Sequence, residues 1–188
     1  MKVAIIGSGV SGIVAIKSCR EEIDLFDRIV CYERTSSIGG LWKYRDLPFD
    51  KNNDNHFDDT VTVMHGTIAN SSKEMSAFSD FPPDPSAPNF MHHKLMYRYI
   101  ESYAKKFDCL QHIRYNREVT EVARSGSGWK VSVRYTNSNN NITSQPRSEF
   151  FDAVLICTGH HGRPVVPSLP GEKSFKGMML FLCTFSAL

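Results

Sequence analysis

A short apolar run followed at once by three glycines constrains the fold of this chain more than any other feature. Lys2 to Gly7 is a β-branched apolar segment that predicts a strand, and Val10 to Cys19 places apolar residues at spacings that line one helix face. Between them lies GSGVSG, a complete GxGxxG pattern at residues 7–12. The order strand, glycine turn and helix is typical of the βαβ unit that binds dinucleotides.

Each glycine of this pattern has a physical task. The first permits the tight turn, the second lets the backbone approach a pyrophosphate, and the third lets helix and strand pack closely. The pyrophosphate would sit at the helix N-terminus, where unpaired N–H groups and the helix dipole favour an anion. The alternative is a glycine-rich turn without a ligand, which the strand and helix on either side disfavour.

A second predicted strand narrows the choice of cofactor. Residues 28–33 read RIVCYE, and Glu33 follows Gly12 by 21 positions. A carboxylate at this point accepts hydrogen bonds from ribose hydroxyls and would repel a 2′-phosphate, so the site suits FAD or NAD rather than NADP. The alternative is a solvated surface glutamate.

Composition excludes several other classes of protein. The chain has 22 Lys+Arg against 20 Asp+Glu, with no basic block, so no nucleic-acid partner is expected. The five cysteines never form a CxxC pair, which argues against a disulfide framework or a zinc site and favours a reducing compartment. The N-terminal apolar run is too short for a signal peptide, and no apolar segment is long enough to span a membrane.

The middle of the chain predicts one long helix. Residues 89–107 carry Met96, Ile100, Tyr103 and Phe107 along one face, which predicts a core stripe. His92 and His93 at its start lack cysteine or carboxylate neighbours, so solvated histidines are expected rather than metal ligands, and the same holds for His160 and His161.

The last third predicts a small antiparallel meander and one more parallel strand. From Glu118 onward apolar and polar residues alternate, as in residues 129–135 (WKVSVRY). Residues 153–158 (AVLICT) form a continuous apolar run, expected of a strand buried on both faces of a parallel sheet. The predicted fold is therefore α/β, with a Rossmann-like parallel sheet, flanking helices and an antiparallel meander.

Four motifs in order, GSGVSG, YERTSSIGGLW, ANSSKEMSAFSDFP and CTGHHGRP, resemble the N-terminal FAD-binding part of a flavin-containing monooxygenase of the microsomal type. The resemblance runs from Met1 to about Gly177. It implies one FAD-binding domain over residues 1–177, without the NADPH-binding domain and C-terminal portion of the family. Residues 178–188 are left as an apolar tail, interpreted either as a final strand or, preferably, as foreign sequence.

The resemblance also assigns roles to particular residues. Gly7 to Ser11 would cradle the FAD pyrophosphate, Glu33 would hold the adenosine ribose, and Asn70 would be the active-site asparagine beside the flavin. The alternative for Asn70 is a turn cap with its neighbouring serines. The residues expected to bind cofactor are Gly7, Ser8, Gly9, Val10, Ser11, Gly12, Glu33, Gly40, Leu41, Trp42, Ala69, Asn70 and Ser71.

In the family, NADPH reduces FAD and one oxygen atom of O2 passes to a soft nitrogen or sulfur nucleophile, the small-molecule substrate expected here. The histidine of the family motif FxGxxxHxxx(Y/F) is replaced by Phe181. Because the second nucleotide domain of the family is lacking, the chain is expected to be incomplete or inactive as a monooxygenase. The alternative is a non-catalytic FAD-binding or regulatory fragment that pairs with a full-length relative. The resemblance implies association with the endoplasmic reticulum, or a cytosolic location if the chain exists as given.

A flavin disulfide reductase is the third possibility. Such an enzyme would need a redox cysteine pair soon after Gly40, yet the next cysteine after Cys31 is Cys109.

Overall fold

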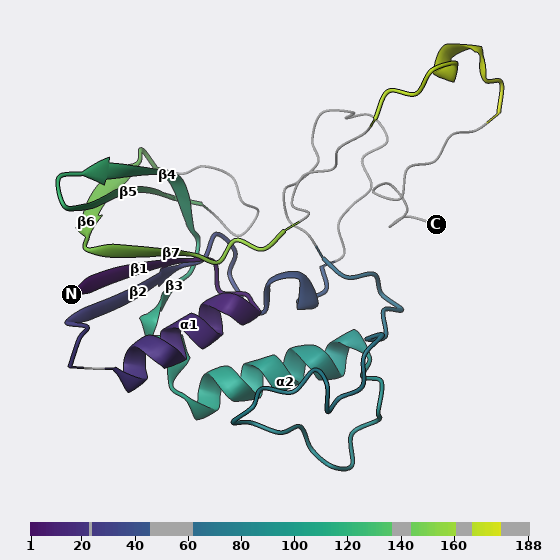
Figure 1. Cartoon of the computed structure of the whole chain (residues 1–188), viewed down its shortest axis with the longest axis horizontal. Coiled ribbons are helices and arrows are strands. Elements are labelled where there is room, and N and C mark those ends of the chain that lie inside the picture. Colours follow the sequence, from purple (N-terminus) through teal and green to yellow (C-terminus); the bar gives the residue numbers. More distant parts are fainter. Residues whose placement is uncertain (23, 46–61, 137–143, 161–166, 178–188) are drawn as a thin grey trace.

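The computed structural model describes residues 1–22, 24–45, 62–136, 144–160 and 167–177. Two β-sheets and two α-helices make up its main body, with short 3-10 turns between them (Figure 1). The apolar tail, Phe181 and His161 lie outside the described residues. In chain order the elements are β1 (Lys2–Ile6), α1 (Val10–Glu21), β2 (Arg28–Tyr32), η1 (Gly40–Trp42), α2 (His93–Lys106), η2 (Cys109–His112), β3 (Ile113–Arg114), β4 (Arg117–Ser125), β5 (Gly128–Tyr135), β6 (Arg147–Phe151), β7 (Ala153–Ile156) and η3 (Glu172–Ser174).

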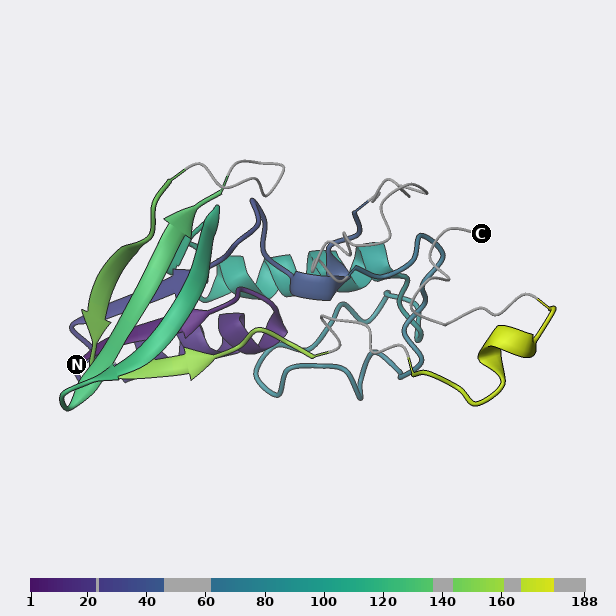
Figure 2. The ribbon, with the colours of Figure 1, turned by 90° about the horizontal axis from the view of Figure 1, so that it is seen from above.

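The first sheet is parallel, with strand order β3-β2-β1-β7. Helices α1 and α2 lie on one face of this sheet, and the antiparallel sheet β4-β5-β6 covers the other (Figures 1 and 2). The predicted Rossmann-like arrangement with an antiparallel meander is thus confirmed. Sandwiching between two layers explains the continuous apolar run of β1, because both faces of that strand are buried.

The alternation of side chains along β1 divides the core into two parts. Val3 and Ile5 pack with α1 and α2, whereas Ala4 packs with the meander residues Val131 and Phe151. The predicted α2 stripe behaves as core: Met96, Ile100 and Tyr103 are buried.

Two expectations about burial are wrong. Residues 153–158 are not buried on both faces: β7 ends at Ile156, and Leu155 and Ile156 are 38% and 71% exposed. Within the described residues β7 is the edge of its sheet, pairing with β1 alone. His93 is 1% exposed rather than solvated, since it opens α2 and turns inward to donate from Nε2 to the His65 carbonyl at 3.0 Å.

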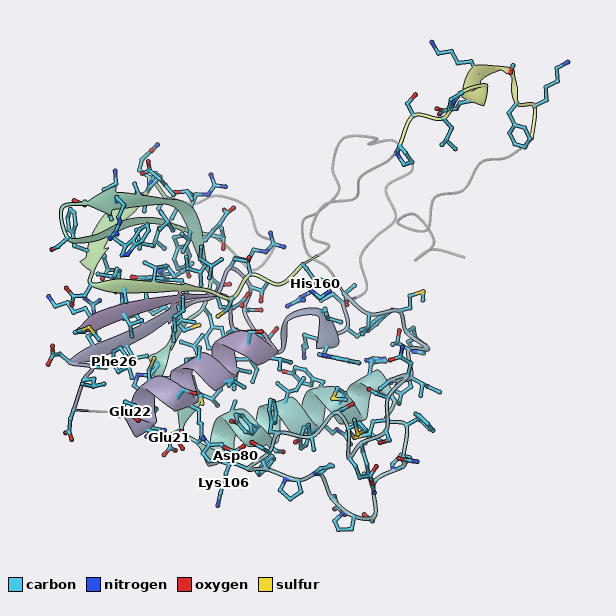
Figure 3. All side chains as sticks on the ribbon, viewed as in Figure 1. Glu21, Glu22, Phe26, Asp80, Lys106 and His160 are labelled. Carbon is cyan, nitrogen blue, oxygen red and sulfur yellow. The ribbon has the colours of Figure 1, made fainter. Side chains whose placement is uncertain are left out.

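The segment from residue 62 to α2 is fixed to the body by polar contacts. Ala69 donates its N–H to the Met91 carbonyl at 2.9 Å. Asp80 lies beside both helices in Figure 3 and pairs with Lys17 of α1 at 2.7 Å. These contacts position Ala69, Asn70 and Ser71, which lack regular secondary structure of their own. No helix in the described part of the chain is long and apolar enough to cross a membrane.

Candidate functional site

The carboxyl ends of β1 and β2 and the N-terminus of α1 meet at a cavity of about 600 Å³. The turn after β1 is tied to β2, because Gly7 donates its N–H to the Tyr32 carbonyl at 2.8 Å. A cavity at this edge of a parallel sheet is where doubly wound folds bind ligands. Its lining residues are Ile6, Gly7, Gly9, Val10, Ser11, Tyr32, Glu33, Arg34, Thr35, Gly39, Gly40, Leu41, Trp42, Arg45, Arg117, Glu118, Val119, Cys157, Thr158, Gly159 and His160.

The three glycines of the turn differ in what surrounds them. A Cβ on Gly12 would lie 1.9 Å from the Gly7 carbonyl oxygen, and one on Gly7 would lie 2.6 Å from the Cys157 carbonyl oxygen. Gly7 also has φ +95°, which favours glycine. A Cβ on Gly9 would meet nothing closer than the Gly40 Cα at 3.7 Å. Gly7 and Gly12 are therefore required by the fold, whereas Gly9 keeps the cavity open.

The N-terminus of α1, as far as the described residues show, has the features of an anion site. Its N-cap is Gly9, which supplies no side-chain hydrogen bond, and the first turn carries no acidic residue. The first N–H groups of a helix need partners, and the dipole favours negative charge there. Val10 and Ser11 of this turn line the cavity, so the arrangement suits a pyrophosphate.

The turn at Gly39 and Gly40 packs against the turn that follows β1. Gly39 donates its N–H to the Ser8 carbonyl at 3.0 Å. A Cβ on Gly40 would lie 3.1 Å from the Gly9 Cα, so the two backbones approach closely. Leu41 and Trp42 follow in η1 and extend the cavity wall.

Glu33 is buried at 7% exposure, which rules out a solvated surface glutamate. Its Oε2 accepts from the N–H and the hydroxyl of Ser8, at 2.8 and 2.9 Å. Its Oε1 accepts from the N–H and the hydroxyl of Thr35, at 2.9 and 2.8 Å. The four acceptor positions of the carboxylate are thus filled by protein donors.

Three arginines on the cavity wall are functional candidates that the sequence analysis missed. Arg34 follows Glu33 directly, Arg45 comes from the loop after η1, and Arg117 opens β4. Arg45 donates to Thr35 Oγ1 at 3.1 Å, and the guanidinium of Arg117 lies 4.2 Å from the centre of the Tyr135 ring. Their positive charge suits a ligand that carries phosphates.

A second, smaller cavity of about 170 Å³ shares Val10 and Trp42 with the first. Ala69, Asn70 and Ser71 line it together with residues of α2. The turn-cap alternative for Asn70 finds no support in its contacts: Ser71 and Ser76 pair their hydroxyls at 2.7 Å, and Ser72 Oγ accepts from Met75 N–H. The described residues give the Asn70 amide no hydrogen bond, so it is available to a ligand.

The predicted site residues therefore fall into three groups. Eight of them line the large cavity, and two of these, Val10 and Trp42, also line the small one. Ala69, Asn70 and Ser71 line the small cavity alone. Ser8 and Gly12 lie behind the wall, where they brace Glu33 and the Gly7 turn. His160, which is labelled in Figure 3, is exposed as expected and also lines the large cavity.

The cavity cysteine and two further buried cysteines are poor nucleophiles. Cys157 lines the large cavity, and burial raises its pKa. Burial likewise raises the pKa of Cys31, and that of Cys109 to about 11. Protonated thiols of this kind do not suit thiol redox chemistry. No group of His, Cys, Asp and Glu that could hold a metal occurs in the described ranges.

A family model described as flavin-binding monooxygenase-like matches residues 1–186. The chain is 40% identical over 183 residues to dimethylaniline monooxygenase (N-oxide-forming) 2 from Oryctolagus cuniculus, and 38% identical to flavin-containing monooxygenase 5 from Rattus norvegicus. These matches cover 94% of the chain and 31% of each relative, so the chain spans about a third of their length.

Solved structures agree with these relatives. S-allyl-L-cysteine S-oxygenase from Allium sativum superposes with a TM-score of 0.78 at 26% identity, covering 94% of this chain and 40% of that one. Cyclohexanone monooxygenase from Rhodococcus sp. Phi1 bound to NADP+ superposes with a TM-score of 0.64 at 21% identity, covering 94% and 29%. The second likeness is one of fold alone.

Proposed function

Because the chain belongs to the flavin-binding monooxygenase-like family, we propose that it binds FAD in the large cavity as the FAD-binding part of an NADPH- and O2-dependent monooxygenase. The observation that carries the proposal is the space at Gly9, beside an uncapped helix N-terminus. A side chain there would fill the volume that a pyrophosphate needs. The residues present therefore fit the cofactor.

Each part of the cavity has a task in holding FAD. Val10 and Ser11 N–H groups would bind the pyrophosphate, and the wall arginines would offset its charge. The buried Glu33 would receive the ribose. Leu41 and Trp42 would contact the flavin ring and exclude water from it.

We propose that the small cavity serves the reacting end of the cofactor. Asn70 would stand there as the active-site asparagine, with Ala69 and Ser71 on either side. An amide both donates and accepts without titrating, so it can orient a polar reactant over a wide pH range. When bound, FAD supplies the transfer of electrons from NADPH to O2 and of one oxygen atom to the substrate.

The proposed substrate is a small molecule with a soft nitrogen or sulfur atom. The support comes from relatives: one is named for dimethylaniline N-oxide formation, and a similar structure is an S-oxygenase of S-allyl-L-cysteine. NADPH is the proposed reductant, in line with NADP+ bound to cyclohexanone monooxygenase, which shares the fold.

The visible absorbance spectrum of the purified chain with added FAD tests the binding proposal. A spectrum of bound flavin supports it, and a folded chain that leaves FAD free contradicts it. NADPH consumption in the presence of O2 and a tertiary amine then separates two roles. Turnover supports the monooxygenase, whereas bound FAD without turnover favours a non-catalytic or regulatory fragment.

A further inference from the structure

The two oxygens of the Glu33 carboxylate differ in how firmly the protein holds them. Each accepts one backbone N–H and one hydroxyl, from Ser8 on Oε2 and from Thr35 on Oε1. A hydroxyl has a single hydrogen and donates to one acceptor at a time. How firmly each Glu33 oxygen is held therefore depends on whether the hydroxyl that donates to it can reach another acceptor.

Among the described residues, Thr35 has a second acceptor and Ser8 has none. The Ser37 carbonyl oxygen lies 3.0 Å from Thr35 Oγ1, within hydrogen-bond reach. In the described part of the chain, the Ser8 hydroxyl has Glu33 Oε2 as its one acceptor, at 2.9 Å. Thr35 can thus release Glu33 without losing a hydrogen bond, whereas Ser8 would have to leave its hydroxyl unpaired in a buried position.

Arg45 holds the Thr35 hydroxyl oxygen in place while the hydroxyl hydrogen can rotate about the Cβ–Oγ1 bond. Its guanidinium donates to Thr35 Oγ1 at 3.1 Å and to Ser37 Oγ at 3.3 Å. The donated bond occupies a lone pair of the threonine oxygen and leaves its hydrogen free to point to either acceptor. Thr35 is also 8% exposed, so water does not readily replace either partner.

We propose that Thr35 is a specificity-determining residue whose hydroxyl holds Glu33 Oε1 in the free protein and turns to the Ser37 carbonyl when a ribose hydroxyl arrives. This inference rests on the proposed binding of FAD. It identifies Oε1 as the oxygen that receives the ribose, with Oε2 remaining bound to Ser8. This rotation of the Thr35 hydroxyl replaces a hydrogen bond to a charged acceptor with one to a neutral acceptor, so it opposes ribose binding.

The proposal predicts that removing the Thr35 hydroxyl tightens the binding of a ligand that has ribose hydroxyls. Isothermal titration calorimetry on the full chain would compare ADP with 2′,3′-dideoxyadenosine diphosphate. Thr35→Val should bind ADP about three- to tenfold more tightly than the wild type, with the dideoxy ligand unchanged. Thr35→Ala, which also lacks the hydroxyl, should likewise bind ADP more tightly than the wild type.

Thr35→Ser is the matched control, because it keeps the hydroxyl and should show the wild-type ratio of the two affinities. An unchanged ratio in Thr35→Val and Thr35→Ala, or weaker ADP binding in both, would overturn the proposal. FAD binding by the wild-type chain is measured alongside. If the wild type binds FAD and ADP while the ratio stays unchanged, only this inference fails; if it binds neither, the proposed function fails too.

Discussion

Ser8 and Glu33 are joined by two hydrogen bonds to one oxygen: the backbone N–H and the hydroxyl of Ser8 both donate to Glu33 Oε2. Ser8 lies in the turn after β1 and Glu33 follows β2, so the carboxylate braces the ends of two neighbouring strands. A residue expected to touch only the cofactor therefore also holds the cavity in shape.

Glu33→Gln should lower the free energy of unfolding as well as the affinity for FAD. The glutamine NH2 group would face donors of Ser8 or Thr35 that have no acceptor left. Leaving buried donors unpaired costs about 1–3 kcal/mol, and the loss of the charged acceptor should weaken FAD binding by about 1–2 kcal/mol. Chemical denaturation and an FAD titration measure the two effects.

Glu118→Gln is the matched control for that variant. Glu118 also lines the cavity, but it pairs with Arg134 at 2.6 Å on a partly exposed surface. Its replacement should change stability by less than about 1 kcal/mol. Equal losses in both variants would mean that general charge loss, rather than the bracing of Ser8, explains the effect.

Gly12→Ala and Gly9→Ala should separate folding from binding. The added methyl at residue 12 would collide with the Gly7 carbonyl, so we expect a loss of more than about 3 kcal/mol or no folded protein. The methyl at residue 9 has room, so that variant should melt within a few degrees of the wild type. Thermal unfolding checks the pair, and a similar loss in both would contradict the geometry.

Glu149 should make stability depend on acidic pH. It accepts from Tyr32 at 2.7 Å, and it pairs with Arg28 at 2.5 Å and Arg114 at 3.0 Å, joining the meander to the parallel sheet. Burial alone would raise its pKa, but the hydrogen bonds from Tyr32 and Arg28 and the nearby positive charges hold the pKa below its usual 4.5.

A carboxyl with a depressed folded-state pKa stabilises the fold above its usual pKa, and that stability is lost as the pH falls through the folded value. Glu149→Gln should therefore unfold more easily by about 1–2 kcal/mol at pH 7 and lose less stability between pH 5 and pH 3. Denaturant unfolding at several pH values measures this. If Glu149→Gln loses as much stability between pH 5 and pH 3 as the wild type, Glu149 does not cause this pH dependence.

His93 should make stability depend on pH closer to neutrality than Glu149 does. Burial is the largest cause that holds its pKa below the usual 6.5, and His92 beside it adds to that effect. The unfolded chain then binds a proton that the folded chain does not, so stability falls as the pH drops below about 6.5. His93→Gln keeps a donor for the His65 carbonyl and should show a shallower decline between pH 7 and pH 5. A decline as steep as that of the wild type would contradict this assignment.

The unit formed by β1, α1 and β2 was predictable because its signals are local. The turn depends on the positive φ of Gly7 and on the close approach of Gly12 to the Gly7 carbonyl, both within six residues. Strands β1 and β2 are short apolar runs whose burial follows from their composition. The meander was predictable for the same reason, since alternate side chains of β5, among them Val131 and Val133, face the parallel sheet.

The rest depends on contacts between distant segments. Thr35 and Arg45 meet only after the chain turns at Gly39, and Arg117 arrives from β4. The burial of His93 follows from its packing beside Tyr44 and His65, which lie far from it in sequence. No local pattern marks such residues before the fold brings them together.

The most direct test of the central claim is an FAD titration of the wild-type chain beside Gly9→Ala, followed by the change in flavin fluorescence. We expect saturable binding of one FAD by the wild type and affinity at least tenfold lower in the equally stable variant, because the methyl would occupy the space that the pyrophosphate needs. Equal affinity in the two proteins, or no binding by a folded wild-type chain, would contradict the central claim.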